Sequence, residues 1–400
     1  MFAARLSVFV VFALNGIVIG SWAPRMPTVA DQIGASPGEL GLALLGASIG
    51  MITSASVAGR LCARFGARAV VLTSVLGTAV ILPLIAVVAS PIQLGLALIA
   101  LGAVVGTFDV AMNIAAVTVV RRTERPIMPV FHAGFSFGAL FGSVVAAFAA
   151  GHRIGLLAHF LTMSALMLVV TAAVIRWVPR EEPAADPEAH RGTDRRMLRR
   201  PVLWLLGVIA LCSAIVEGGS GDWSALFAVR ERGMGEAAAA ITFSVFCVAM
   251  AIVRLTGEQA ERRWGAARML IGGSVVASAG LLATAIIPSG PLAFVGFGLA
   301  GAGLAFAFPL ALNMAGAIGR RGDGTGGERE IGFVTSIAYS GFLIGPPMLG
   351  GIAQVTNLEV AIGFAGVVAA LIAPIALAAA AARRREENEE PSRVPALNRR

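Results

Sequence analysis

Two acidic residues, Asp109 and Glu217, lie within stretches that are otherwise long and apolar enough to cross a bilayer. A charge near the middle of a membrane costs several kcal/mol, so an intramembrane acid is a candidate functional residue. Desolvation at that depth favours the protonated carboxyl, which would allow the group to load and release protons. The alternative is a structural carboxylate held by neighbouring Asn, Ser or Arg side chains. We predict that Asp109 and Glu217 couple the protein to protons.

Small and polar residues surround both acids at helical spacing. Residues three or four apart share one face of a helix, which applies to Gly102, Gly106, Asp109 and Asn113, and to Ser213, Glu217, Ser220 and Ser224. The small residues would let a neighbouring helix approach, and the polar ones would face an interior cavity. The alternative for Glu217 is an acid tied to the serines of its own bundle.

A second set of residues has the chemistry to contact a small solute. Apolar rings stack on the C–H faces of a sugar or on an organic cation, while carboxylates, amides and hydroxyls bond polar groups. The alternatives are an interfacial belt for tryptophan, hydrogen bonds between helices for the amides, a helix cap for the histidine and purely structural partners for the rest. The predicted solute-binding residues are Asn15, Trp22, Asn113, His132, Asp222, Trp223, Asn313 and Tyr339.

The elements that must position these residues are membrane spans. The 400-residue chain is 57% hydrophobic and 14% charged, which is typical of a membrane protein and not of a soluble domain. A span needs about 20 apolar residues to cross a hydrocarbon core. The sequence predicts an all-α protein with twelve spans, near 6–24, 41–59, 69–88, 92–118, 131–150, 155–175, 202–227, 238–256, 268–287, 291–317, 332–353 and 360–381.

The arginines predict the orientation of these spans. Segments on one side carry only Arg25, Arg153, Arg230 and Arg232, and all other arginines fall on the side of the two termini. By the positive-inside rule both termini are cytoplasmic, in a bacterial inner membrane. The arginine clusters indicate anchoring to a lipid bilayer and not nucleic-acid binding. Cys62, Cys212 and Cys247 lack metal-ligand spacing, so we expect no metal and no cofactor.

A polar, Pro-rich segment divides the chain into two halves that match each other weakly. We predict a six-helix bundle at 1–178, a cytoplasmic linker at 179–200, a second bundle at 201–382 and a cytoplasmic tail at 383–400. With a shift near 200 residues, Trp22 meets Trp223 and Asn113 meets Asn313. Duplicated six-helix halves around a central cavity are one recurring transporter plan.

These features resemble the major facilitator superfamily over essentially the whole chain. The loop after the second span, Gly59-Arg-Leu-Cys-Ala-Arg64-Phe-Gly66-Ala-Arg68, is similar to that family's G-x-L-x-D-R-x-G-R-R/K motif, with Ala63 at the position of the Asp. The segments around Asp109 and Glu217 resemble a bacterial branch related to fucose:proton symporters. The resemblance implies two pseudo-symmetric bundles that rock about a central site, with Gly59, Arg64, Gly66 and Arg68 in gating.

A Gly-Pro-Pro element in the eleventh span is a further candidate for gating. It contains Gly345, Pro346 and Pro347, and it resembles an antiporter signature that this superfamily carries in its fifth span. Proline removes an internal hydrogen bond and allows a local bend.

The resulting expectation is secondary active transport by alternating access, by a monomer. The leading hypothesis is proton-coupled uptake of a small polar, sugar-like solute. The competing one is proton-coupled efflux of an amphiphilic compound. A membrane-embedded enzyme or receptor is a remote alternative, because no nucleophile with its base, paired metal ligands or phosphate loop occurs in the sequence. We therefore do not expect an enzyme.

Overall fold

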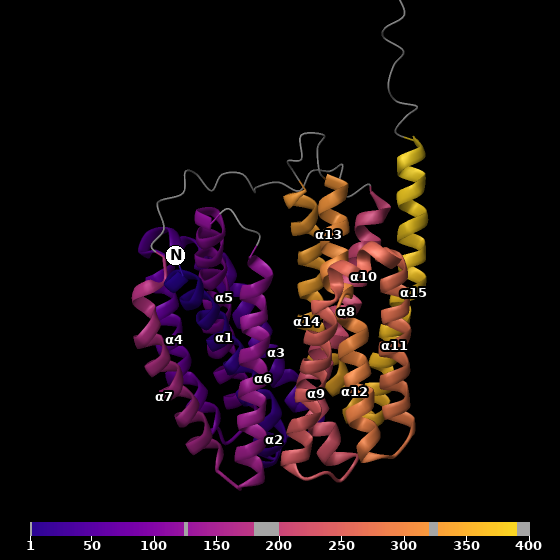
Figure 1. Cartoon of the computed structure of the whole chain (residues 1–400). Helices are drawn as coiled ribbons and strands as arrows, with labels where there is room; N and C mark the ends of the chain where they lie inside the picture. The colour runs from indigo at the N-terminus through magenta and orange to yellow at the C-terminus, as the bar shows by residue number, and fades with distance from the viewer. Residues whose placement is uncertain (1, 124–126, 180–199, 320–326, 390–400) are drawn as a thin grey trace, which may run out of the picture.

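The computed structural model describes residues 2–123, 127–179, 200–319 and 327–389, and within these ranges it contains helices and turns but no strand. Figure 1 shows two groups of helices side by side. The first group comprises α1 (Phe2–Trp22), the 3-10 helix η1 (Ala23–Arg25), α2 (Met26–Ile33), α3 (Pro37–Phe65), α4 (Ala67–Ile85), α5 (Pro91–Thr123), α6 (Met128–Gly151), α7 (Leu156–Val174) and η2 (Ile175–Trp177). The second comprises α8 (Pro201–Arg230), α9 (Glu236–Leu255), α10 (Gly257–Trp264), α11 (Ala266–Ile286), α12 (Gly290–Leu304), α13 (Ala307–Gly319), α14 (Glu328–Val355) and α15 (Leu358–Glu389).

The described helices confirm a multi-pass membrane architecture. Eleven of them are long and apolar enough to cross a membrane, or twelve if the bent pair within α3 is counted as one span. The first span runs through α1, η1 and α2 to Ile33, past the predicted end at 24, because Pro24 and Pro27 occupy first-turn positions where proline is tolerated. The tenth span consists of α12 and α13, with a break at Ala305 and Phe306.

Matched glycines show that the two groups repeat each other. Gly66 and Gly265 have positive φ angles of 80° and 78° at the loops that follow α3 and α10, and Gly34 and Gly233 have 62° and 60° at the turns that follow α2 and α8. Residues other than glycine rarely adopt these backbone angles. The weak sequence repeat therefore corresponds to a repeat of backbone conformation.

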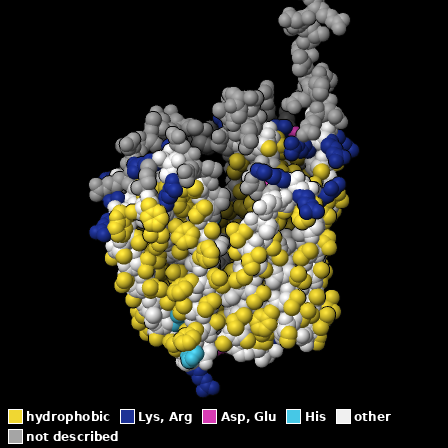
Figure 2. Space-filling model, viewed as in Figure 1, with side chains coloured by type: hydrophobic (Ala, Val, Ile, Leu, Met, Phe, Trp, Pro, Cys, Tyr) yellow, Lys and Arg dark blue, Asp and Glu magenta, His cyan; other side chains and the backbone are white. Residues whose placement is uncertain are grey.

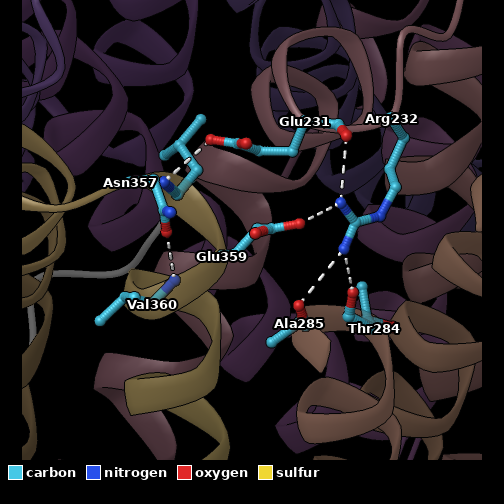
Figure 3. A network of polar contacts seen from close by, with 8 residues as sticks. Glu231, Arg232, Thr284, Ala285, Asn357, Glu359 and Val360 are labelled. Atoms are coloured by element: carbon cyan, nitrogen blue, oxygen red, sulfur yellow. Dashed lines mark hydrogen bonds and ion pairs between the residues drawn. The ribbon is translucent and has the colours of Figure 1, made fainter. Parts of the chain in front are cut away.

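Side-chain hydrogen bonds to backbone carbonyls near helix ends, which we call polar staples, also occur at matching places in the two groups. In the first, the Gln32 amide donates to the carbonyl oxygens of Ala86 and Val88, at 3.0 and 2.8 Å. In the second, Arg232 donates to the carbonyl of Thr284 at 2.6 Å and pairs with the carboxylate of Glu359 at 2.5 Å (Figure 3). Each staple satisfies carbonyls at a helix end that have no partner within the helix.

Within each group, helices approach at small residues. A methyl group on Gly16 of α1 would overlap the Phe135 carbonyl of α6, and one on Gly50 of α3 would overlap the Ile99 carbonyl of α5. Such close backbone contact is typical of membrane helices, which gain no hydrophobic driving force from each other. Each half therefore packs as a tight unit.

The predicted domain boundaries remain predictions, because most of the linker, 180–199, lies outside the described residues. The predicted tail starts at 383, but α15 continues to Glu389. Ala and Arg favour helix, and Arg200 at the start of α8 pairs with Glu386 at 2.9 Å. The helix therefore extends past the span into the predicted tail.

Candidate functional site

A cavity of about 400 Å³ lies between the two halves. Helices α1, α3, α5 and α6 line it from the first half, and α8, α9 and α14 line it from the second. Most of its lining is apolar, with aromatic side chains from Trp22, Phe135, Phe243, Phe246 and Phe342. Its volume is within the range of about 300–1,000 Å³ that is usual for small-molecule sites.

Among the predicted residues, Glu217 lines this cavity and forms an ion pair there. Its Oε1 lies 3.4 Å from Nη2 of Arg254 on α9, and the two side chains are 25% and 40% exposed. The Nε of Arg254 also donates to the carbonyl of Ala305 at 3.1 Å. Ala305 lies at the break between α12 and α13, so its carbonyl lies outside the regular α-helical segments. Arg254 thus joins α8, α9 and the broken span.

Asp222 lies five residues further along α8 and also lines the cavity. No residue that the structure describes forms a hydrogen bond or ion pair with its side chain. Phe243 of α9 lines the same cavity, and its Cε2 lies 3.6 Å from the position that a methyl on Gly221, the residue before Asp222, would occupy. Asp222 is therefore an acid without a partner among the described residues, in a cavity that it shares with aromatic side chains.

Asp109 does not line the cavity but lies one turn beyond Val105, which does. It is half-buried, and it lies close enough to Tyr339 on α14 for its charge to act on that hydroxyl. Tyr339 is 41% exposed. Asp109 belongs to the first half and Tyr339 to the second, and along their helices both lie between the cavity-lining residues and the arginine-rich loops.

The three predicted amides lie outside the cavity lining. Asn113 donates to the carbonyl of Asp109 in its own helix at 2.8 Å. Asn15 is buried between α1 and α5, where its Nδ2 lies 3.5 Å from the sulfur of Met112 and its Oδ1 has no partner among the described residues. Asn313 is exposed on α13.

The two matched tryptophans differ in their surroundings. Trp22 lines the cavity, whereas Trp223 is fully buried within the second half and is absent from the lining. Trp22 ends α1 between the halves, while Trp223 lies inside the long helix α8. The predicted histidine, His132, is exposed, and its ring packs edge-on against Phe12 with 5.2 Å between the ring centroids. The charge of Arg254 acts on this imidazole.

The cavity is closed at one end by contacts between the halves. We call the end of the molecule with Arg64, Arg121 and Arg254 the arginine-rich face, and the other end the opposite face. Five hydrogen bonds or ion pairs join the halves among the described residues: Thr28–Glu236, Asp31–Arg230, Gly38–Gln354, Ser48–Phe342 and Ser143–Ser244, at 2.6–3.1 Å. All five lie toward the opposite face. Figure 2 shows a hollow between the halves toward the end where arginine side chains gather.

The Gly-Pro-Pro element takes part in this closure. Pro346 lines the cavity, and its carbonyl oxygen is 2.7 Å from where a methyl on Gly41 of α3 would lie. Gly345 packs against Ile215 of α8, and Pro347 lies inside α14. The α3 and α14 backbones therefore meet between the halves near this element.

The predicted gating loop lies on the arginine-rich face. Gly66 ends α3 with a positive φ, and the Arg64 guanidinium lies over the Phe65 ring at 5.2 Å. Arg68 donates through Nε to the carbonyl of Val178 at 2.7 Å, which ties this loop to the end of η2. A methyl on Gly59 would meet no atom within 4 Å.

Arg254 and Phe243 are cavity residues that the sequence did not predict. Arg254 falls within the predicted span 238–256, and an intramembrane arginine needs an acidic partner. That signal could have identified it, but the arginine pattern assigns the residue to loop anchoring. Phe243 carries no such signal, because apolar aromatic residues are common in any span.

The comparisons with known proteins agree with this architecture. The family model described as Major Facilitator Superfamily matches residues 8–326. An uncharacterized MFS-type transporter of Yersinia pestis is 32% identical over 365 residues, which cover 90% of this chain and 91% of that protein. An uncharacterized transporter of Sinorhizobium fredii (strain NBRC 101917 / NGR234) is 31% identical over 376 residues, which cover 91% of this chain and 95% of that protein.

Two solved structures show the same fold. A mutant of the nucleoside transporter NupG matches with a TM-score of 0.78 at 13% identity, over 94% of this chain and 99% of that one. A bacterial homolog of the human lysosomal transporter Spinster, in an inward-facing and occupied conformation, matches with a TM-score of 0.72 at 16% identity, over 94% and 96% of the two chains.

Proposed function

The chain belongs to the Major Facilitator Superfamily, and from that premise we propose that it is a secondary active transporter that moves a small organic solute by alternating access without converting it. The observation that supports this most is the cavity between the two halves, with acids from α8 in its wall. Rocking of the halves would expose this cavity to each side of the membrane in turn.

We propose that the arginine-rich face is cytoplasmic, in a bacterial inner membrane, with both termini on that side. The positive-inside rule supports this orientation. The contacts between the halves then lie at the periplasmic side, so the structure represents a state open to the cytoplasm.

Asp109 is the proposed proton-coupling residue. Glu217 is a weaker candidate because it is already engaged in an ion pair with Arg254. Asp109 and Tyr339 lie on different halves near the mouth of the cavity, where the halves would meet when the arginine-rich face closes. Burying an unpaired carboxylate is costly, so closure would favour its protonated form. The two states would then hold the proton with different affinity, as coupling requires.

The lining supports an amphiphilic solute better than a sugar-like one. No Asn or Gln is present among the described residues that line the cavity, although a sugar needs several hydrogen-bonding partners. Uptake of a sugar-like solute remains the second candidate because Trp22 and Asp222 share the cavity. A ring face and a carboxylate are the groups that such a solute would need.

Reconstituted protein with a pH-sensitive dye inside the vesicles tests coupling. Sugars and aromatic amines are added one at a time, and solute-dependent proton flux is recorded. We expect at least one solute to move protons through the wild type. Asp109→Asn should abolish this flux but retain exchange of labelled solute, whereas Glu217→Gln should keep part of the flux. Proton flux unchanged in Asp109→Asn would refute the assignment.

The direction of transport is tested in vesicles of known orientation. In inside-out vesicles with an acidic interior, efflux by antiport predicts that solute accumulates. Uptake by symport predicts no accumulation there, and predicts accumulation in right-side-out vesicles under an inward proton gradient. Transport that is indifferent to any proton gradient would refute proton coupling in both forms.

A further inference from the structure

We propose that the cavity binds a monovalent organic cation with an apolar body, with the positive group at Asp222. This assignment rests on the proposed function for its biological meaning, but the binding itself can be tested separately.

The cavity lining holds more acidic than basic side chains among the described residues. Its charged lining residues among the described part of the chain are Glu217, Asp222 and Arg254. Glu217 and Arg254 pair with each other at 3.4 Å, so they neutralise each other. When Asp222 is ionised, its negative charge has no counter-charge among these lining residues. A cation would compensate this charge, whereas an anion would be repelled by it.

Arg254, the one arginine among the described lining residues, already has two partners. Its Nη2 contacts Glu217 and its Nε contacts the Ala305 carbonyl. An anionic solute would have to compete with a carboxylate held on the protein. The site is therefore poorly suited to carboxylates, phosphates or sulfonates.

Aromatic and methionine side chains share the cavity with Asp222. Phe243 of the neighbouring helix α9 packs against Gly221, the residue before Asp222, and Phe243 and Trp22 line the same cavity as Asp222. Aromatic faces attract cations, and this attraction is stronger when the cation is desolvated. Met51 and Met250 add polarizable, adaptable side chains to the lining. These groups can surround an apolar body without specifying a hydrogen-bonding pattern.

This proposal has a mechanistic consequence for transport. A cation at Asp222 is neutralised in the cavity, so it can cross the membrane interior without an isolated buried charge. The charged groups that share the cavity lining with this carboxylate among the described residues are Glu217 and Arg254, and the charge of Arg254 also acts on His132. None of them offers a second unpaired negative charge, so the cavity accommodates one positive charge at a time.

The test compares two ions of the same shape and opposite charge. Radiolabelled tetraphenylphosphonium and tetraphenylborate are titrated onto the full protein in nanodiscs, with empty nanodiscs subtracted. We expect saturable binding of the phosphonium with at least tenfold higher affinity than the borate. Asp222→Asn should weaken phosphonium binding at least tenfold, and Phe243→Leu several-fold. Asp222→Glu should restore most of the affinity, and the surface variant Glu261→Gln serves as the control.

The outcomes separate this inference from the proposed function. Equal affinity for the two ions, or unchanged phosphonium binding in a folded Asp222→Asn protein, would overturn the cation site. Proton-coupled transport of a neutral solute without any phosphonium binding would also overturn it, while the proposed function would stand. Phosphonium binding without any proton-linked flux would support the site and contradict the proposed function. If Asp222→Asn does not fold, the matched ions on the wild type and the Asp222→Glu variant decide.

Discussion

At the scale of single residues, the partner of an acid decides what the acid can do. Asp109, Glu217 and Asp222 all lie in apolar helices, yet only Glu217 has a cationic partner among the described residues. Arg254 lies 3.4 Å from Glu217, so the two side chains form an ion pair. Asp109 and Asp222 lack such a partner in the described part of the chain, which fits the roles that we propose for them, Asp109 for a proton and Asp222 for a solute. One ion pair thus divides three similar side chains into different roles.

A double-mutant cycle measures this ion pair. Glu217→Gln and Arg254→Met each leave one charge unmatched in the cavity, so the two single effects on stability should sum to more than the effect of the double variant. Because the two side chains are 25% and 40% exposed, water screens the pair. We expect a coupling free energy of at most about 1 kcal/mol. Thermal unfolding in detergent provides the measurement, and strict additivity would show that the pair contributes nothing.

At the scale of elements, small residues determine where helices can meet. Pairs such as Gly16 with Phe135 lie inside one half and lock helices of the same bundle together. Gly41 and Gly350 lie instead on α3 and α14, which belong to different halves, and a methyl group on Gly41 would lie 3.1 Å from the Cα of Gly350. This crossing therefore brings the backbones of the two halves together on the side of the closed face.

Gly41→Ala tests whether this crossing controls the closure. The new methyl would lie 2.7 Å from the Pro346 carbonyl oxygen, so the helices must separate. We expect a larger population open at the opposite face, seen as longer distances between spin labels at the exposed sites Val87 and Ile286, one in each half. Gly272→Ala in α11, whose methyl meets no atom within 4 Å, is the matched control. Identical distance distributions in the two variants would contradict this role of Gly41.

At the scale of the whole molecule, polar contacts on one face hold the two halves in a single relative position. Arg25 shows that this closed position carries a cost. It is 3% exposed, donates to the Ile154 carbonyl at 3.1 Å, and has two further nitrogens without partners among the described residues. Unpaired buried donors destabilise the state that buries them. A modest cost of closure would suit the alternation between two states that we propose.

Exchanging the charges of Asp31 and Arg230 tests the ion pair that closes the opposite face. The two side chains are 58% and 39% exposed, so the pair is worth up to about 1 kcal/mol and its loss should change the ratio of the two states by at most about fivefold. Arg230→Asp should favour the state open at the opposite face, and adding Asp31→Arg should restore the original ratio. The same spin-label distances report the result. Failure of the double variant to recover would show that charge pairing is not the cause.

The sequence by itself determined the membrane class, the repeat of two halves and the approximate spans, because these follow from apolar length, arginine distribution and local spacing. It also singled out Glu217, Asp222 and Trp22, which the structure places in the cavity lining, because polar or aromatic residues in apolar helices are conspicuous. Only the tertiary structure decided that Arg254 pairs with Glu217, that the predicted amides lie outside the cavity, and that Trp223 is buried while Trp22 lines it. Helical periodicity gives the face of a residue within its own helix, but which neighbour covers that face depends on packing between helices far apart in the chain.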